Sequence, residues 1–324
     1  MSGSDVAVTL VTFESAGDLP RCLDALASQT SPPREVVVVD NASQDRSVEI
    51  AQAHPIVTRV ERNADNRGFA AAQNQAIAGT SAPWVLVLNP DVTLAPEFLS
   101  ELRPHLERGT PLGAVCGKLL RAGSDGSPRI PATLDSTGIV FDRSFRHLDR
   151  GSETEDRGLY EEVEEVFGAT GAAVCFRRAM IEDVRIEGEF FDEAFFAYRE
   201  DADVAWRAQL LGWDCLYVPR AIGWHVRQVL PTNRRSTDAS LNRHSVKNRF
   251  LMRIKNADAA VWWRCGWRGL LRDVVVIGGC LTIEWASLPG LVDVFRLAPR
   301  AVRHRRWIRA HRRRTCAEVA RWFT

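Results

Sequence analysis

The chain has 324 residues, of which 45% are hydrophobic and 26% charged, a composition typical of globular proteins and unlike that of a disordered chain. Its formal net charge of +1 gives no overall sign of a nucleic-acid binder. The seven cysteines are scattered, with none in C-x-x-C spacing, which argues against a disulfide framework and a structural zinc site. The first residues lack a basic segment before their apolar run, so we expect a cytoplasmic protein without a secretory signal.

Strand and helix patterns alternate through the first part of the chain. The expected strands cover 5–13, 34–40, 57–61 and 84–91, and the expected helices cover 19–30, 43–54 and 70–80. The run "REVVVVD" is typical of a parallel strand that is buried on both faces. This order predicts an α/β fold with a doubly wound, mostly parallel sheet.

The pattern changes twice further along. Residues 110–165 are rich in glycine, serine, proline and charge, which predicts long surface loops. A strand and the start of a helix are expected within 166–184, and a last strand over 213–219. We expect one domain over residues 1–240 and a helical C-terminal extension over 241–324.

The C-terminal extension combines apolar and strongly basic segments. Its longest uncharged run, Val274 to Ile283, has ten residues, too few to span a bilayer. Residues 300–314 then contain eight arginines, two histidines and Trp307 but no acid. This combination favours a peripheral anchor on an anionic, cytoplasmic membrane face. A helix packed on the core with a solvated basic tail, and a nucleic-acid contact, remain alternatives.

Two of the expected strands end in acidic motifs. Asp40 follows the strand in "VVVVDNAS", and Asp91 follows the strand in "VLVLNPDV". Ligands of doubly wound sheets bind beyond the carboxyl ends of the strands. A third acidic group, Glu200, Asp201 and Asp203, precedes an apolar helix pattern, where such acids are also favoured by the helix dipole alone.

Several ordered motifs together resemble family 2 glycosyltransferases of the GT-A fold, particularly the rhamnosyltransferase-like branch. They are "VTLVTFESAGDLPRCLDALASQ", "EVVVVDNASQD", "NADNRGFAAAQNQAI", "VLVLNPDV" and "FDEAFFAYREDADVAWRAQLLGW". The resemblance covers residues 5–226. It implies a GT-A sheet that binds a nucleotide sugar, here with a helical, membrane-associating extension.

The resemblance implies a nucleotide-sugar site at the strand ends and at the start of the helix after "NADNRG". Read without the family, these motifs are equally good turns and helix caps. Glu14 stands where the family usually has asparagine. The residues implied are Thr12, Glu14, Asp40, Asn41, Asn66, Arg67, Gly68, Asn74 and Asn89.

The resemblance also implies a divalent metal and a catalytic base. Asp91, in the second position of the family's D-x-D element, and His225 would bind Mg²⁺ or Mn²⁺, hard cations that suit a sugar diphosphate. Asp201 would take the proton of the acceptor hydroxyl in an inverting transfer, supported by Glu200 and Asp203. Asp203 is also placed to pair with Arg207 four residues on.

Two further groups are candidates for diphosphate or acceptor binding: Thr170 and Gly171 in "GATGAAVCF", and Lys247 and Arg249 in a basic helix pattern. Packing and a solvated helix face are the alternatives. No Q-x-x-R-W element of processive enzymes occurs, which favours single addition.

The resemblance thus implies transfer of L-rhamnose from dTDP-L-rhamnose to a glycan or polyprenyl-diphosphate-linked acceptor in bacterial surface polysaccharide synthesis. The alternatives are a UDP- or GDP-sugar donor, or a catalytically silent, membrane-attached binding protein.

Overall fold

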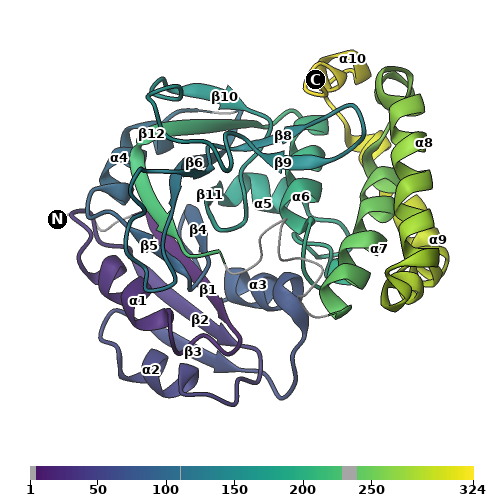
Figure 1. Ribbon diagram of the computed structural model, residues 1–324. Coiled ribbons are helices and arrows are strands. Elements are labelled where there is room, and N and C mark those ends of the chain that lie inside the picture. Colours follow the sequence, from purple (N-terminus) through teal and green to yellow (C-terminus); the bar gives the residue numbers. More distant parts are fainter. Residues whose placement is uncertain (1–4, 110, 228–238) are drawn as a thin grey trace.

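The computed structural model describes residues 5–109, 111–227 and 239–324 (Figure 1). The strands are β1 (Val6–Thr12), β2 (Glu35–Asp40), β3 (Arg59–Arg62), β4 (Trp84–Leu88), β5 (Val92–Leu94), β6 (Leu112–Arg121), β7 (Leu134–Ser136), β8 (Ile139–Phe141), β9 (His147–Asp149), β10 (Glu164–Val166), β11 (Ala173–Arg177) and β12 (Asp214–His225). The helices are α1 (Leu19–Ala27), α2 (Ser47–Ala53), α3 (Gly68–Ala78), α4 (Phe98–Leu106), α5 (Arg178–Val184), α6 (Glu200–Leu210), α7 (Ala239–Asn256), α8 (Ala259–Thr282), α9 (Leu288–His311) and α10 (Cys316–Ala320), with 3-10 turns at Glu193–Phe195 and Trp285–Ser287.

The sheet has ten strands in the order β10-β12-β6-β11-β4-β1-β2-β3, with β5 beside β12 and β7 beside β6. The four strands β4, β1, β2 and β3 run parallel, as the alternating pattern predicts. The remainder is mixed, because β11 lies antiparallel to both β4 and β6. The doubly wound α/β fold is therefore confirmed, with its parallel pairing concentrated in the N-terminal half.

Strand β2 shows why an unbroken valine run forms a central strand. Val36 and Val38 belong to the core on one face of the sheet, together with side chains of α1 and α4. Val37 and Val39 belong to the opposite core, with side chains of α3. Successive side chains of a strand point to opposite faces, so helices on both sides require apolar residues at every position.

The prediction of surface loops over 110–165 is wrong in its first part. Residues 112–121 form β6, a mostly buried strand between β12 and β11. Two glycines obscured it in the sequence: a Cβ at Gly117 would lie 2.1 Å from the carbonyl oxygen of Ala221, so close strand packing requires glycine there. Beyond β6, β8 and β9 form a separate hairpin.

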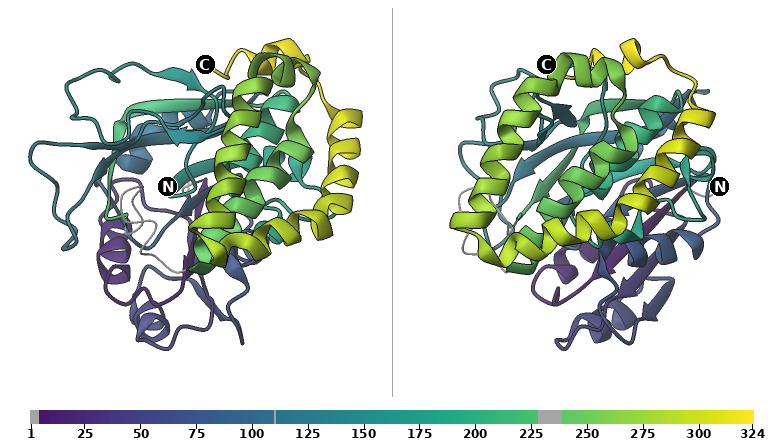
Figure 2. Two further views of the ribbon diagram at one scale, coloured as in Figure 1. Left: turned by 45° about the vertical axis from the view of Figure 1, so that its right-hand side comes forward. Right: turned by 90° about the vertical axis from the view of Figure 1, so that its right-hand side faces the viewer.

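The C-terminal helices pack against the sheet domain (Figure 2). Leu251 of α7, Ala301 of α9 and the C-terminal Phe323 belong to the same core cluster as Val174 of β11. The predicted boundary at 240/241 falls inside α7, just after residues 228–238, which lie outside the described part. Within the described residues no single helix is long and apolar enough to cross a membrane; α8 and the segment Trp285–His311 meet that criterion only as a pair, bent by 112°.

The seven cysteines are free, and six of them are buried. This agrees with the expectation of reduced cysteines without a disulfide framework. A single cluster of aromatic rings around Trp206 of α6 joins Phe141 of β8 and Phe323 at the C-terminus, with ring centroids 5.2 and 4.9 Å from Trp206. The end of the chain is thus part of the packing that holds α6.

Candidate active site

The parallel strands end at a common edge, where the register aligns Thr12 of β1 with Asp40 of β2. Asn89 and Asp91 follow β4 in the turn to β5, and β5 pairs with the end of β12 so that His225 lies opposite Val92. Sheet pairing therefore brings Asp91 next to His225, although 134 positions separate them in the sequence. This is the meeting of strand ends that the motifs predict.

Asp91 and His225 form one side of the candidate site. Their Oδ2 and Nε2 atoms are 3.3 Å apart, and the second oxygen of Asp91, Oδ1, is buried with no hydrogen-bond partner among the described residues. A buried carboxylate oxygen without a donor is costly unless a ligand completes it. An imidazole nitrogen and a carboxylate at this spacing are suitable ligands for a divalent cation.

His225 is held from behind by a second carboxylate. Its Nδ1 lies 2.7 Å from Oδ2 of Asp135 in β7, the arrangement that commonly orients a metal-binding histidine. Burial disfavours the charged ring, but the Asp91 and Asp135 carboxylates outweigh it and raise the pKa of His225 to about 10. A cation at Nε2 would have to replace a proton that the free site holds firmly.

Asp135 belongs to a buried ionic chain that sequence reasoning missed. Arg121 Nε lies 2.8 Å and Arg227 Nη1 3.2 Å from Asp135 Oδ1. Arg227 continues to Asp149 of β9, at 2.7 Å. Although burial opposes ionisation, the hydrogen bond from His225 and the nearby cations lower the pKa of Asp135 to about 2. These ion pairs fix the position of His225. Three of their residues, Arg121, Asp135 and Asp149, lie in the segment that was predicted to be loops.

Asp201 lies at the start of α6, facing the loop before β11. Its Oδ2 accepts a hydrogen bond of 3.0 Å from the backbone N–H of Gly171, and its Oδ1 accepts one of 2.7 Å from Ala202 N. Burial and the nearby charge of Asp149 raise the pKa of Asp201, which makes the carboxylate a better proton acceptor. Gly171 therefore positions Asp201, and the half-buried Thr170 lies beside it.

Glu200 differs from its neighbour in its environment. It is buried, and its Oε2 has no hydrogen-bond partner among the described residues. Burial and the charges of Asp201 and Asp203 raise the pKa of Glu200 well above its ordinary value. Burial thus raises the pKa of both adjacent carboxyls, and in Asp201 the hydrogen bond from the Gly171 N–H opposes this rise.

Asp203 does not face the site. Its side chain is fully buried, with Oδ2 3.1 Å from Arg207 Nε and 2.8 Å from Lys255 Nζ of α7. Asn256 donates to its Oδ1 at 2.7 Å. The predicted pairing with Arg207 is confirmed. Because all these partners lie within the core, we expect Asp203 to support Asp201 only by holding α6 in position.

The basic pair of α7 is also turned into the protein. Lys247 donates a 2.5 Å hydrogen bond to the carbonyl of Ala194, and Arg249 binds Asp273 of α8 at 3.2 Å. Both side chains are thus bound within the protein, and the diphosphate role of Lys247 and Arg249 stays a prediction. The sequence shows that Lys247 and Arg249 are basic, but it does not show which carboxylate or carbonyl group each one binds.

Asn248, between them, holds the loop that leads into α6. Its side-chain amide donates to the carbonyls of Phe195, Ala197 and Tyr198, at 2.9, 2.9 and 2.7 Å. This loop is strained, because Phe196, Tyr198 and Arg199 have φ values of 66°, 69° and 71°, a region that ordinary residues adopt at a cost. α7 thereby fixes the backbone that delivers Asp201.

On the nucleotide side, several predicted contacts bind other parts of the chain. Asp40 is fully buried and accepts from Thr12 Oγ1 at 2.9 Å and from Ser43 Oγ at 2.5 Å. Asn41 donates to the carbonyl of Gly68 at 3.1 Å. These hydrogen bonds join the loops after β1, β2 and β3, and the direct nucleotide contacts of Thr12, Asp40 and Asn41 stay predictions.

Glu14 and Phe13 are the exposed groups at the end of β1. Glu14 Oε1 accepts a 2.7 Å hydrogen bond from Gln44 N, so this departure from the family pattern links the loops after β1 and β2. Phe13, which sequence reasoning missed, has 51% of its surface exposed. An exposed ring at a strand end is suited to stack on a base.

Four predicted ligand residues lie in or just after "NADNRG". The side chain of Arg67 is exposed, whereas Asn66, Gly68 and Asn74 contact other parts of the protein. Arg67 is exposed at the N-cap of α3. Asn66 Oδ1 accepts from Gly68 N at 2.9 Å, and Gly68 adopts φ +82° with Phe196 so near that a Cβ would lie 2.5 Å from its ring. Asn74 binds both backbone groups of Phe191 at 2.8 and 2.9 Å, so its amide holds the chain, and its ligand role stays a prediction.

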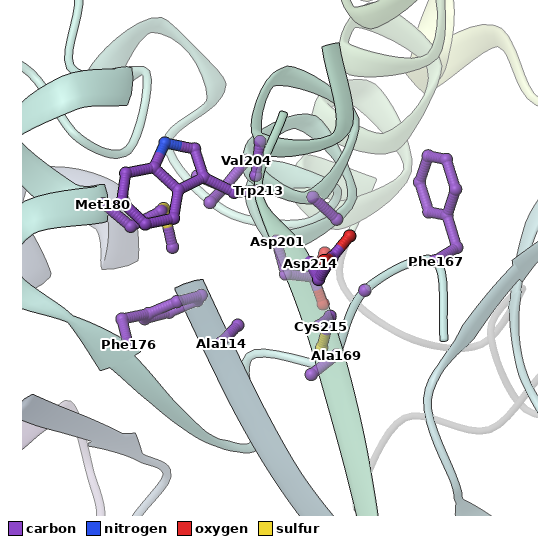
Figure 3. A pocket seen from close by; sticks show the side chains of 13 residues that line it. Ala114, Phe167, Ala169, Phe176, Met180, Asp201, Val204, Trp213, Asp214 and Cys215 are labelled. Carbon is purple, nitrogen blue, oxygen red and sulfur yellow. The ribbon is translucent and has the colours of Figure 1, made fainter. Parts of the chain in front are cut away.

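Asp201 also lines a narrow cavity between α6 and the sheet, shown in Figure 3. Its walls are mainly apolar, with Ala114 and Phe176 from the sheet and Met180 and Trp213 beside them. The enclosed space of about 10 Å³ is about that of one water molecule. This space is too small to hold a sugar.

The family model described as glycosyl transferase family 2 matches residues 7–185. The chain belongs to this family. Its sequence is 28% identical over 299 residues to N-acetylglucosaminyl-diphospho-decaprenol L-rhamnosyltransferase of Mycobacterium tuberculosis (strain CDC 1551 / Oshkosh), covering 86% of this chain and 92% of that relative. The resemblance to the rhamnosyltransferase-like branch is confirmed, and the chain is a glycosyltransferase.

Solved structures support the GT-A fold. A mannosyltransferase from Pyrobaculum calidifontis, in complex with GDP-Man and Mn²⁺, matches with a TM-score of 0.54 at 17% identity, over 96% of this chain and 86% of that one. Residues 1–349 of S. aureus TarS, in complex with UDP-GlcNAc, match with a TM-score of 0.55 at 17% identity, over 98% and 89%. Both structures resemble this chain in fold, and neither identifies its sugar donor.

Proposed function

We propose that this glycosyltransferase moves L-rhamnose from dTDP-L-rhamnose, with inversion and in single additions, onto a polyprenyl-diphosphate-linked glycan. Two observations support the reaction type: Asp201 at the start of α6 has a raised pKa, and Asp91 and His225 meet at the strand ends as candidate metal ligands. The donor and acceptor classes rest on the similarity to the L-rhamnosyltransferase of M. tuberculosis.

Different residues of the chain act on the bond that forms and on the bond that breaks. Asp201 accepts the proton of the acceptor hydroxyl while the acceptor oxygen forms its bond to the anomeric carbon. The bond from the anomeric carbon to the diphosphate oxygen breaks on the opposite face, which inverts the configuration. Asp91 and His225 would hold Mg²⁺ or Mn²⁺, which would neutralise the charge that develops on the departing diphosphate.

The side chains near this edge suggest how the donor is oriented. Phe13 is placed to stack on the base, and the exposed Arg67 at the start of α3 to face the diphosphate, where the helix dipole also favours negative charge. Asn89, in the turn after β4, can contribute a carbonyl oxygen. Asp135 and Gly171 act through His225 and Asp201 and are positioning residues.

A UDP- or GDP-sugar donor is the second candidate, since the neighbours in fold hold GDP-Man and UDP-GlcNAc. A panel of dTDP-L-rhamnose, UDP-GlcNAc and GDP-Man, tested by thermal shift and by transfer to a lipid-diphosphate acceptor, separates the two. We expect stabilisation and transfer with dTDP-L-rhamnose. Transfer must stop with EDTA and return with Mn²⁺ or Mg²⁺. Transfer from only a UDP- or GDP-sugar would contradict the rhamnose assignment, and undiminished transfer in EDTA would contradict the metal.

A further inference from the structure

Helix α8 has two opposite apolar stripes, one buried against the protein and one exposed to solvent. Val261, Cys265 and Gly269, four residues apart, face the protein and are buried. On the other side, Trp263, Trp267, Leu270 and Val274 follow at i, i+4, i+7 and i+11, so they share one helix face. They are 92%, 63%, 59% and 69% exposed. A helix that is apolar on its solvent side has an unpartnered surface.

The exposed surface continues beyond the bend after α8. Trp285 in the following 3-10 turn is 66% exposed, and Phe295 of α9 is 80% exposed. We call Trp263, Trp267, Leu270, Val274, Trp285 and Phe295 the outer apolar face. It lies on the helical layer farthest from the sheet, which Figure 2 shows turned toward the viewer in its right-hand view.

The outer apolar face is held in place from beneath. Asp273 of α8 is mostly buried and accepts hydrogen bonds from Arg249 and Arg253 of α7, at 3.2 and 2.6 Å. α7 is in turn joined to α6 by the pair of Lys255 and Asp203. Because α8 is fixed on α7 by buried charges, its exposed side cannot be turned inward without breaking those pairs.

The rim of this face is positively charged. Between Asp293 and Glu318 the chain has nine arginines and no acid. Some of them bind back to the protein: Arg300 lies 2.5 Å from Glu189, and Arg313 2.6 Å from Asp183. Arg306 and Arg309 are exposed and have no carboxylate partner in the part of the chain that the structure describes. Trp307, by contrast, packs partly on the core.

We propose that the outer apolar face binds the headgroup layer of an anionic bilayer, with α8 and the first half of α9 lying along the surface. Tryptophan suits this layer because its ring is apolar and its N–H is polar. The unpaired arginines would face the anionic headgroups. A second copy of the chain is a poorer occupant, since a symmetric dimer through this face would bring two cationic rims together.

The proposal stands on the outer apolar face and its rim, and it holds whichever sugar is transferred. The proposed contact differs from the expected anchor, because it would be made by tryptophans of α8 and of the turn after it, whereas Arg300 and Arg313 of the basic segment 300–314 bind back to the protein. Residues of the same helical layer hold the loop before α6. The face would therefore present the active site at a fixed height above lipid-linked acceptors.

Flotation of the full chain with lipid vesicles tests this. We expect the chain to float with phosphatidylcholine vesicles that contain phosphatidylglycerol and to remain largely below with phosphatidylcholine alone. Trp263→Ser combined with Trp267→Ser should lower the partition coefficient at least about tenfold, since each ring removes a large apolar area from contact with lipid. Arg306→Gln with Arg309→Gln should lower it about tenfold on anionic vesicles only.

The matched control is Ile130→Ser with Leu159→Ser, two residues that are 97% and 73% exposed in loops outside the face. It should float as the parent chain does. Absence of flotation with anionic vesicles, or equal losses in the control, would overturn the proposal. So would a sedimentation shift from dimer to monomer in the tryptophan variant without any change in flotation, or salt-sensitive binding to DNA or RNA that the same tryptophan substitutions abolish.

Discussion

Asn248 offers a direct test of how the C-terminal helices serve catalysis. Its side chain is fully buried and donates to three backbone carbonyls of the loop before α6. In Asn248→Ala these carbonyls lose their donors, while Phe196, Tyr198 and Arg199 keep backbone conformations with positive φ. The loop then has less to hold it in a strained path that ends at Asp201.

The size of the effect follows from those contacts. A buried hydrogen bond contributes about 1 kcal/mol net, and a residue held at positive φ costs about 1–3 kcal/mol. Loss of three bonds should lower the free energy of unfolding by about 2–4 kcal/mol. Relaxation of the loop would also displace Asp201, and a displacement of about 1 Å at a reacting group costs about 100-fold in rate.

The assay compares Asn248→Ala with Leu251→Ala in the same helix. Leu251 is 2% exposed, and its truncation should cost a similar 2–5 kcal/mol or so without touching the loop. Urea unfolding gives both stabilities, and kcat is then measured at a temperature where both variants are folded. We expect kcat to fall about 10- to 100-fold in Asn248→Ala and to stay near the parent value in Leu251→Ala. Equal kcat values for the two variants would refute the positioning role.

Three further results are expected. Asp203→Asn should lower the free energy of unfolding by about 3–5 kcal/mol, because Arg207 and Lys255 lose their charged buried partner. It should nevertheless reduce turnover far less than Asp201→Asn does. Equal turnover losses, measured where both variants are folded, would contradict this. Because the pKa of Asp201 is raised and the base acts when deprotonated, kcat/KM should fall as pH drops through a value above the ordinary 3.9 or so of aspartate, and Asp149→Asn should move this limb to lower pH; an unmoved limb would exclude their coupling. Gly68→Ala, which forces a Cβ to 2.5 Å from the Phe196 ring, should destabilise the chain by at least about 2 kcal/mol in thermal unfolding, and an unchanged Tm would show that the ring moves freely.

The parts of the fold that sequence patterns predict are those with simple local causes. The valine run of β2 alternates between two cores, so its composition alone indicates a central strand. β6 escaped prediction because Gly113, Gly117 and Lys118 interrupt its apolar run. Gly117 is needed for close approach to β12, and Lys118 is buried beside Asp156 and Glu161, which only the folded structure brings together.

The same distinction between local patterns and long-range contacts applies to the candidate active site. Asp91, Asp201 and His225 could be proposed from the sequence because each belongs to a motif at a strand or helix end. Asp135 was missed because it lies 90 positions from His225 in sequence and within a segment without periodicity. Asp203 shares the motif of Asp201 but is rotated two positions around α6, which turns it toward Lys255 and the core, and the motif alone does not show this.

The central claim is that Asp201 is the base of the transfer. Its most direct test is the turnover of Asp201→Asn with donor and lipid-diphosphate acceptor, measured beside the donor Kd of the same variant. The substitution keeps the size and the position of the side chain but removes the proton acceptor. We expect an unchanged donor Kd and a kcat reduced by about 100- to 10,000-fold. A kcat within a few-fold of the parent value would contradict the account.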